Sequence, residues 1–276
     1  MKTILVPIDF SKPSEYAAKM AAKMAIKTKA TIYLIHLIEL PKGVVDMGSS
    51  SRFSIPESML YLRKVREKVL EFKGNIFSED IQVEYFIKLN NPFEGILKYA
   101  DKINADLIIM GSKGHSSFKG IRIGSNTEKV VRSSKTPVIV VKKEPKKFKM
   151  KNLVFASSFK NENKKEIFKK FLDFATLFNS KIHLLKVNTA SNFESTYDAT
   201  EKIHEFIKEF ELPKHTINIY NDLSIEKGIL NFSKDINADL IALSTNGRTG
   251  ISHLFTASVT RKLNKKALKP ILTLRV

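Results

Sequence analysis

The chain repeats itself, and this repeat constrains its fold more than any other feature. The segment INADLII at 103–109 recurs as INADLIA at 236–242, and ILVPIDF at 4–10 aligns with LVFASSF at 153–159. Self-similarity on this scale indicates two copies of one folding unit, each long enough to bury its own core. We therefore expect two domains, at 1–144 and 150–276, connected through the charged segment KKEPKKFKM at 142–150.

Each copy alternates apolar strands with helical stretches. In the first copy the patterns predict strands at about 3–9, 30–38, 82–88, 106–110 and 137–142, and helices near 12–28, 57–73, 92–103 and 125–134. In the second they predict strands near 152–157, 181–187, 215–220, 239–243 and 270–275. Alternation of this kind is typical of an α/β fold, a doubly wound parallel sheet with helices on both faces.

A loop spaced by glycines follows the fourth expected strand. Gly111, Gly114 and Gly124 form the pattern G-x2-G-x9-G-S, and a helix is expected to begin at Gly124-Ser125. Glycines permit positive φ and a close approach of backbone N–H groups to an anion, and a helix N-terminus adds donors and partial positive charge. The spacing matches neither a Walker A loop nor the G-x-G-x-x-G of dinucleotide folds. It indicates a phosphate site of another type.

The other side of such a site is expected at the end of the first strand. TILVPID ends at Asp9, and the next helix begins with Ser11 as N-cap and Pro13 in its first turn. Ligands of open parallel sheets bind beyond the carboxyl ends of the strands, where the winding direction reverses. We expect Asp9 and Gly111 to meet there.

These segments resemble the universal stress protein family. The resemblance rests on ILVPIDFS, LIHLIEL, INADLIIMGSKGHSSFKGIRIGS and PVIVVKK, and it covers residues 2–143 strongly. It implies two tandem domains, each a five-stranded parallel sheet with strand order 3-2-1-4-5. In the members that carry this glycine pattern, it also implies binding of ATP or another adenine nucleotide.

The resemblance assigns a role to each matching position. It implies that Asp9 contacts the adenosine part of the nucleotide. The base would be walled by Pro7, Ile8, Leu37 and Met110. The ribose and phosphates would be held by Gly111, Lys113, Gly114, Gly124, Ser125, Asn126 and Thr127. Any metal would be Mg²⁺ or Mn²⁺ arriving with the phosphates, because the six histidines show no metal-ligand spacing.

The second copy lacks most of these residues. Ser158, Ser244 and Ala257 stand where the first copy has Asp9, Gly111 and Gly124; Gly247 and Ser258 remain from the pattern. The degenerate second domain is therefore expected to serve a structural or regulatory role. It is also about 16 residues shorter between its first and fourth strands, and we assign this difference to the segment from Pro41 to Pro56, whose own role the sequence leaves open.

Composition narrows the possible partners. The chain has no cysteine, and neither a signal peptide nor a membrane-spanning run is apparent, which favours a cytoplasmic protein. The net charge is +19, but most of the 47 basic residues are lysines, which suit a solvated surface better than specific nucleic-acid binding.

Three functions stay open at this point. The leading hypothesis is an adenine-nucleotide-binding stress-response protein that acts on an unidentified protein partner. The second is a slow ATPase, for which no catalytic residue beyond Asp9 is evident. The third is a nucleotide-independent interaction protein, since Ser125 and Glu128 could form a capping box without ligand.

The fifth strands are expected to pair the two halves. PVIVV at 137–141 and PILTL at 270–274 would each form a sheet edge, and proteins usually cover or pair such edges. Pairing within the chain would produce an intramolecular pseudo-dimer, with a further homodimer as an open alternative.

Overall fold

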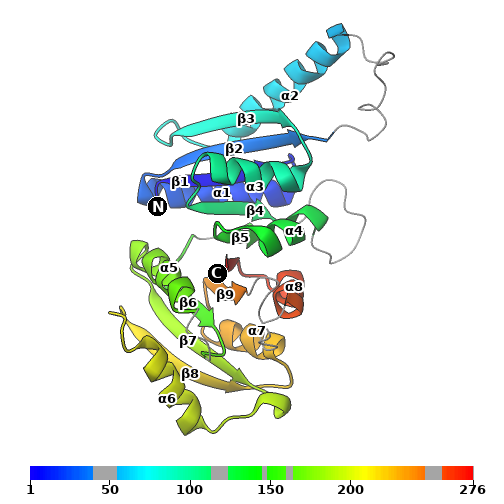
Figure 1. Cartoon of the computed structure of the whole chain (residues 1–276). Helices are drawn as coiled ribbons and strands as arrows, with labels where there is room; N and C mark the ends of the chain where they lie inside the picture. The colour runs from blue at the N-terminus through cyan, green and yellow to red at the C-terminus, as the bar shows by residue number, and fades with distance from the viewer. Residues whose placement is uncertain (40–54, 113–123, 145–147, 160–163, 246–256, 276) are drawn as a thin grey trace.

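A computed structural model shows a single twisted sheet running through both halves of the chain (Figure 1). The structure describes residues 1–39, 55–112, 124–144, 148–159, 164–245 and 257–275. The strand order is β3-β2-β1-β4-β5-β10-β9-β6-β7-β8, so each half has the expected order 3-2-1-4-5. The strands are β1 Thr3–Ile8, β2 Thr31–Ile38, β3 Val83–Leu89, β4 Leu107–Gly111, β5 Val138–Val141, β6 Asn152–Ala156, β7 Lys181–Asn188, β8 His215–Asn221, β9 Leu240–Thr245 and β10 Ile271–Arg275.

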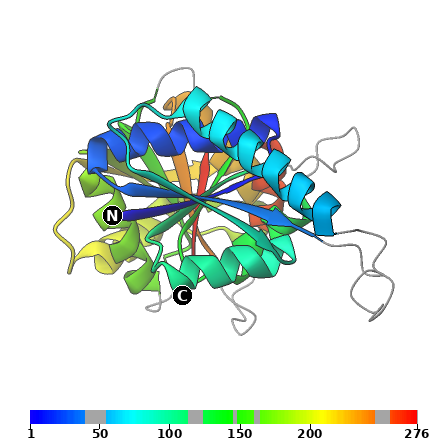
Figure 2. The same cartoon turned by 90° about the horizontal axis from the view of Figure 1, so that it is seen from above.

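Helices cover both faces of the sheet, as Figure 2 shows in the view from above. The helices are α1 Lys12–Thr28, α2 Ile55–Ile76, α3 Pro92–Lys102, α4 Ser125–Ser133, α5 Lys164–Leu177, α6 Thr196–Ile207, α7 Ile225–Asp235 and α8 Ala257–Lys266, with a short 3₁₀ turn, η1, at Ala190–Asn192. Within each half the strands are parallel and successive strands are linked by helices, which confirms the doubly wound α/β class.

The core differs between the two faces. On the face covered by α1, α2, α5 and α6, buried apolar side chains from both halves form one continuous cluster. On the opposite face the buried residues divide into one cluster under α3 and α4 and another under α7 and α8. One face of the sheet therefore holds the halves together, while the other leaves each half with a core of its own.

The junction is an antiparallel pairing of the two fifth strands. Leu272 pairs with Ile139 and Thr273 with Val138, and the Thr273 hydroxyl donates to the Val138 carbonyl at 3.2 Å. The Arg275 guanidinium donates to the carbonyls of Arg132 and Ser133, which end α4. The expected contact between the fifth strands is thus present, and it makes the two edges interior strands of one sheet.

The length difference between the copies has two sources, so its assignment to the segment from Pro41 to Pro56 was incomplete. Helix α2 has 22 residues whereas α6 has 12. The connection also differs, because β2 ends at Ile38 and α2 begins at Ile55, while β7 ends at Asn188 and α6 begins at Thr196. Residues 40–54 themselves lie outside the described residues.

Candidate functional site

Three elements of the N-terminal half meet at the carboxyl edge of its sheet. Strands β1 and β4 are parallel neighbours, with Ile4 paired to Leu107 and Leu5 to Ile108. Their carboxyl ends therefore lie at the same edge, where α1 begins after β1 and α4 begins at Ser125. Both helix N-termini face this edge, which makes it electropositive at backbone level.

Asp9 is held at this edge by the residue that caps α1. The Ser11 N–H and hydroxyl donate to Asp9 Oδ1 at 3.1 Å and 2.5 Å. Ser11 is the N-cap of α1, as expected, and its side chain accepts from the Ser14 N–H at 3.4 Å. Phe10, between them, has φ of 61°, in the left-handed region that bulky residues rarely adopt. The turn thus directs a partly exposed carboxylate to the strand end.

Gly111 is required by close packing rather than by its backbone angle. A Cβ built on Gly111 would lie 2.6 Å from the backbone carbonyl carbon of Pro13, so any side chain here would push the first turn of α1 away from β4. Its φ lies outside the left-handed region, and Gly124 has φ of −60° and ψ of 140°. The expectation that these two glycines adopt positive φ was therefore wrong.

The N-terminus of α4 is anchored to β4, and its N-cap residue makes no side-chain hydrogen bond. The Thr127 hydroxyl donates to the Gly111 carbonyl at 2.9 Å, and the Gly124 N–H donates to the Ser112 carbonyl at 2.8 Å. The N-cap is Gly124, which has no side chain to satisfy the N–H groups of the first turn, those of Ser125 and Asn126 among them.

The expected capping box between Ser125 and Glu128 is absent. Ser125 is the first helical residue rather than the cap. The Glu128 carboxylate instead accepts from Arg261 Nε on α8 at 2.6 Å, which links the two halves across the junction. The expectation of a capping box was wrong because the helix begins at Ser125, one residue earlier than a box with Ser125 as N-cap requires.

The residues expected to wall the base lie on different faces of the sheet. Leu37 and Met110 belong to the cluster under α3 and α4, and a Cβ built on Gly95 of α3 would lie 2.6 Å from Leu37 Cδ2. Pro7 is next to Ile8, and neighbouring strand residues point to opposite faces. The Ile8 side chain is buried in the cluster under α1 and α2, so only its backbone can line the edge.

Two aromatic rings near Asp9 were not among the expected site residues. The ring of Phe10 lies 4.6 Å from that of His36, and His36 Nδ1 lies 2.9 Å from the Ile8 carbonyl oxygen. A sequence signal existed, because Phe159 aligns with Phe10 in the second copy. Its φ of 56° matches the 61° of Phe10, so both turns carry the same conformation.

Part of the expected phosphate site cannot be placed. Lys113 and Gly114, and with them His115, Lys119 and Arg122, lie outside the described residues.

In the parts of the chain that the structure does describe, no group of three His, Cys, Asp or Glu side chains is arranged to hold a metal ion. None of the described helices is long and apolar enough to cross a membrane.

The equivalent edge of the C-terminal half carries buried serines. Ser157 and Ser158, which follow β6, are buried, and the Ser157 hydroxyl accepts from the Phe159 N–H at 3.2 Å. Ser244, at the position of Gly111, is 1% exposed, and its hydroxyl has no hydrogen-bond partner among the described residues. At the ends of β6 and β9, Ser158 and Ser244 therefore replace the carboxylate of Asp9 and the glycine at position 111.

Comparisons with known proteins agree with this architecture. The family model described as "Universal stress protein family" matches residues 1–142 and 150–275. The chain belongs to the universal stress protein family. Two curated universal stress proteins of Methanocaldococcus jannaschii, MJ0577 and MJ0531, are 30% and 33% identical to it. The alignments cover 52% and 53% of this chain, and 96% and 84% of the relatives.

A solved structure extends the likeness to the whole chain. The crystal structure of a universal stress protein from Archaeoglobus fulgidus covers 99% of this chain and 98% of its own, with a TM-score of 0.73. At 21% identity this likeness concerns the fold. The tandem arrangement of two such domains is therefore shared with another family member.

Proposed function

We propose that the N-terminal half of this universal stress protein binds one adenine nucleotide at the carboxyl edge of β1 and β4, in a stress response. The observation that carries the proposal is that the Asp9 carboxylate and the N-terminus of α4, whose N-cap is a glycine, lie at the same edge of the sheet. These two groups bind different parts of a ligand. A carboxylate accepts hydrogen bonds from hydroxyl and amine groups, whereas the N–H groups at a helix N-terminus donate to phosphate oxygens. A nucleotide carries both kinds of partner at the two ends of one molecule.

The geometry suggests a division of roles. Asp9, oriented by Ser11, would accept from the adenosine part, next to the apolar Leu37 and Met110. The N–H groups at the start of α4 would donate to phosphate oxygens, with Thr127 keeping the helix on β4. Lys113, Gly114, Gly124, Ser125 and Asn126 would complete the phosphate site, and Mg²⁺ or Mn²⁺ would accompany the phosphates.

The C-terminal half, residues 150–276, would serve a structural or regulatory role. Burial of Ser158 and the side chain of Ser244 remove the two features that the first half offers to a nucleotide. The half keeps the strands and helices that build the fold and covers the β5 edge of residues 1–144. Nucleotide occupancy of the first half would then bias how the chain meets its protein partner.

Calorimetry on the full chain with ATP, ADP, AMP and cyclic AMP tests the proposal. We expect a stoichiometry of one nucleotide per chain. The substitution Asp9→Ser copies the second half and should weaken binding by roughly 10- to 100-fold, as expected for loss of a hydrogen bond to a charged group. The matched control Ser158→Asp should leave the stoichiometry at one.

Two nucleotides per chain, or undiminished affinity in a folded Asp9→Ser variant, would contradict this assignment. Product formation followed over hours with ATP and Mg²⁺ distinguishes simple binding from slow ATPase activity. Absence of binding for all four nucleotides would favour the nucleotide-independent interaction protein.

A further inference from the structure

The junction of the two halves contains a cavity on the face of the sheet where the core is continuous. Its volume is about 450 Å³, within the range of small-molecule sites. Its lining includes Leu107, Lys135 and Thr136 of the first half and Asp173, Phe174 and Leu177 of the second. Leu107 begins β4, whereas the proposed nucleotide site lies at Gly111, where β4 ends. The cavity therefore joins both halves at a place separate from the proposed nucleotide site.

The buried part of the lining is apolar. Leu107 of β4 and Leu272 and Leu274 of β10 are each at most 1% exposed. Together with Phe174 of α5 they belong to the core cluster that runs through both halves. Leu177, at the end of α5, is 44% exposed. An apolar group of a ligand that enters this cavity would remove such surface from water, which favours binding.

The rim of the cavity carries unpaired charges of both signs. Lys135 precedes β5 in the first half, and Asp173 lies on α5 in the second. Neither side chain forms an ion pair or a hydrogen bond with the described residues, so they do not pair with each other either. The two remaining charged lining residues have partners. Lys170 pairs with Glu166 at 2.9 Å, and Asp106 accepts from two backbone N–H groups at the start of the chain, at 2.5 Å and 3.0 Å.

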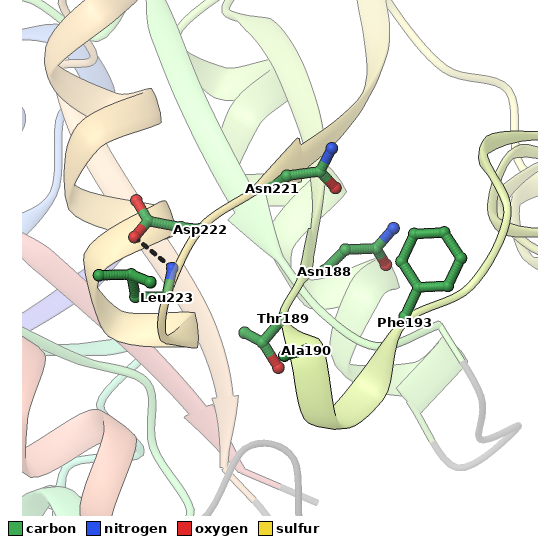
Figure 3. Close-up of a pocket in the computed structure, with 7 residues that line it drawn as sticks. All are labelled: Asn188, Thr189, Ala190, Phe193, Asn221, Asp222 and Leu223. Carbon is green, nitrogen blue, oxygen red and sulfur yellow. Dashed lines mark hydrogen bonds between the residues drawn. The ribbon is translucent and has the colours of Figure 1, made fainter.

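A hollow of about 520 Å³ at the carboxyl ends of β7 and β8 lacks such a pair of charges. Among the described residues that line it Asp222 alone is charged, and Figure 3 shows this carboxylate directed toward α7 and away from Asn188. The carboxylate already accepts from the Leu223 N–H at 2.6 Å and the Asn231 amide at 2.8 Å. The polar groups of that hollow therefore do not converge, whereas the junction cavity offers charges without partners.

Helix α5 is more polar at this cavity than α1 is at the corresponding position. Lys29, after α1, and Asn179, after α5, have φ of 56° and 50°, and this shared conformation aligns the two helices. Met20 of α1 then corresponds to Lys170 of α5. Met20 is 1% exposed, whereas the Lys170 side chain is 43% exposed. The second half thus leaves a charged side chain open to a ligand where the first half buries an apolar one.

We infer that the junction cavity binds a small zwitterion with an apolar side chain, which is the chemistry of a free apolar amino acid. The carboxylate of the ligand pairs with Lys135, its ammonium group pairs with Asp173, and its side chain covers Leu177 and the apolar lining. Because these two charges come from different halves, the ligand stabilises the arrangement of the halves at their junction. The inference does not depend on nucleotide binding by the N-terminal half.

The test is an NMR titration of the ¹⁵N-labelled full chain with L-phenylalanine, with and without saturating ATP. The amide signals of Thr136 and Leu177 should shift together, because one ligand contacts both halves. ATP should leave this titration unchanged, whether or not it binds the N-terminal half, so the two proposals can fail separately.

Three related probes separate the contributions of the ligand groups. Phenylpropionate lacks the ammonium group, phenylethylamine lacks the carboxylate, and glycine lacks the apolar side chain. Each should bind at least about tenfold more weakly than L-phenylalanine, because each loses one charged hydrogen bond or the apolar contact.

Two variants assign the charges, and two matched controls locate the site. Lys135→Met and Asp173→Asn should each weaken L-phenylalanine binding by about tenfold or more. Lys135→Met should leave phenylethylamine binding unchanged, since this probe has no carboxylate, and Asp173→Asn should likewise leave phenylpropionate binding unchanged. Lys98→Met and Asp101→Asn, at exposed positions of α3 on the opposite face of the sheet, should bind like the wild type.

Three results would each overturn the inference. The first is that millimolar L-phenylalanine leaves the Thr136 and Leu177 amides unshifted. The second is that both lining variants bind it normally. The third is that glycine binds as tightly as L-phenylalanine.

Discussion

The carboxyl edges of the two halves show that the same strand order can carry different side chains at the ends of its strands. In the first half Asp9 is oriented at the strand end and Gly111 lets α1 approach β4 closely. In the second half Ser158 is buried and Ser244 carries a side chain at the corresponding point. The strand order is the same in both halves, so these side chains can differ without changing how the sheet is assembled.

A second difference runs in the opposite direction. Strand β2 ends in the apolar Ile38, whereas β7 ends in the buried polar Asn188, at the cavity between β7 and β8. At this strand end the second half therefore buries a polar side chain where the first half buries an apolar one. Ligand sites in this architecture depend on a few residues at strand ends, which can change independently of the core.

The largest expected effect comes from separating the halves. Expressed alone, residues 1–144 lose β10, so β5 becomes an unpaired edge and the continuous core on one face is opened. We expect this fragment to self-associate or aggregate, because an exposed apolar edge strand pairs readily. Sedimentation velocity over a range of concentrations measures this, with the full chain as control. A stable monomer would show that the junction is dispensable.

Exchanging the residues at Gly111 and Ser244 sharpens the comparison of the two edges. Gly111→Ser places a Cβ against the Pro13 backbone and should destabilise the fold by about 1–3 kcal/mol, the usual cost of overpacking. In Ser244→Gly, relief of the unpartnered hydroxyl offsets the backbone entropy cost, so the net change should stay below about 1 kcal/mol. Urea unfolding measures both, and equal losses would contradict the asymmetry.

The halves should also differ in their response to acid. Burial, and then the charge of Lys181, lower the pKa of His183 below its ordinary value of 6.5. The unfolded chain therefore takes up the proton first, and the contribution of His183 to stability, present above about pH 6.5, is lost as the pH falls through its folded pKa. The corresponding position of the first half is Tyr33, since Tyr33 pairs with Leu5 as His183 pairs with Val154.

The substitution His183→Tyr tests this difference. It should reduce the fall in unfolding free energy between pH 7 and pH 5 relative to the wild type, because the remaining carboxylates titrate in both proteins. Urea unfolding at each pH measures the change. An unaltered slope in a folded variant would assign the acid sensitivity to other groups.

The smallest expected effect is at the ion pair that crosses the junction. Glu128→Gln removes the charge that accepts from Arg261; the Arg261 side chain is exposed and that of Glu128 is partly exposed. We expect a loss of at most about 1 kcal/mol, decreasing as salt is added. Thermal melts at low and high salt measure it, with Glu67→Gln on α2 as an exposed control away from the junction. A larger, salt-independent loss would mean that the junction depends on this pair.

Local patterns were sufficient for the strands and helices of the first half, whereas the order of strands was implied by the family resemblance. Helix α1 has the expected bounds because Ser11, Pro13 and the spacing of its apolar residues all act within a few residues of the chain. The placement of Asp9 at a strand end also followed from local pattern. The role of Gly111 did not, because the atom that excludes a Cβ belongs to Pro13, which is distant in sequence.

The sequence by itself determined the repeat, the alternation of strands and helices, and the residue types at each strand end, since these depend on short-range periodicity. Only the tertiary structure decided that the fifth strands, β5 and β10, pair antiparallel, and that the core is continuous on one face of the sheet and divided on the other. The physical reason is that strand pairing and packing bring together residues far apart in the chain, and no local pattern records which of them will touch.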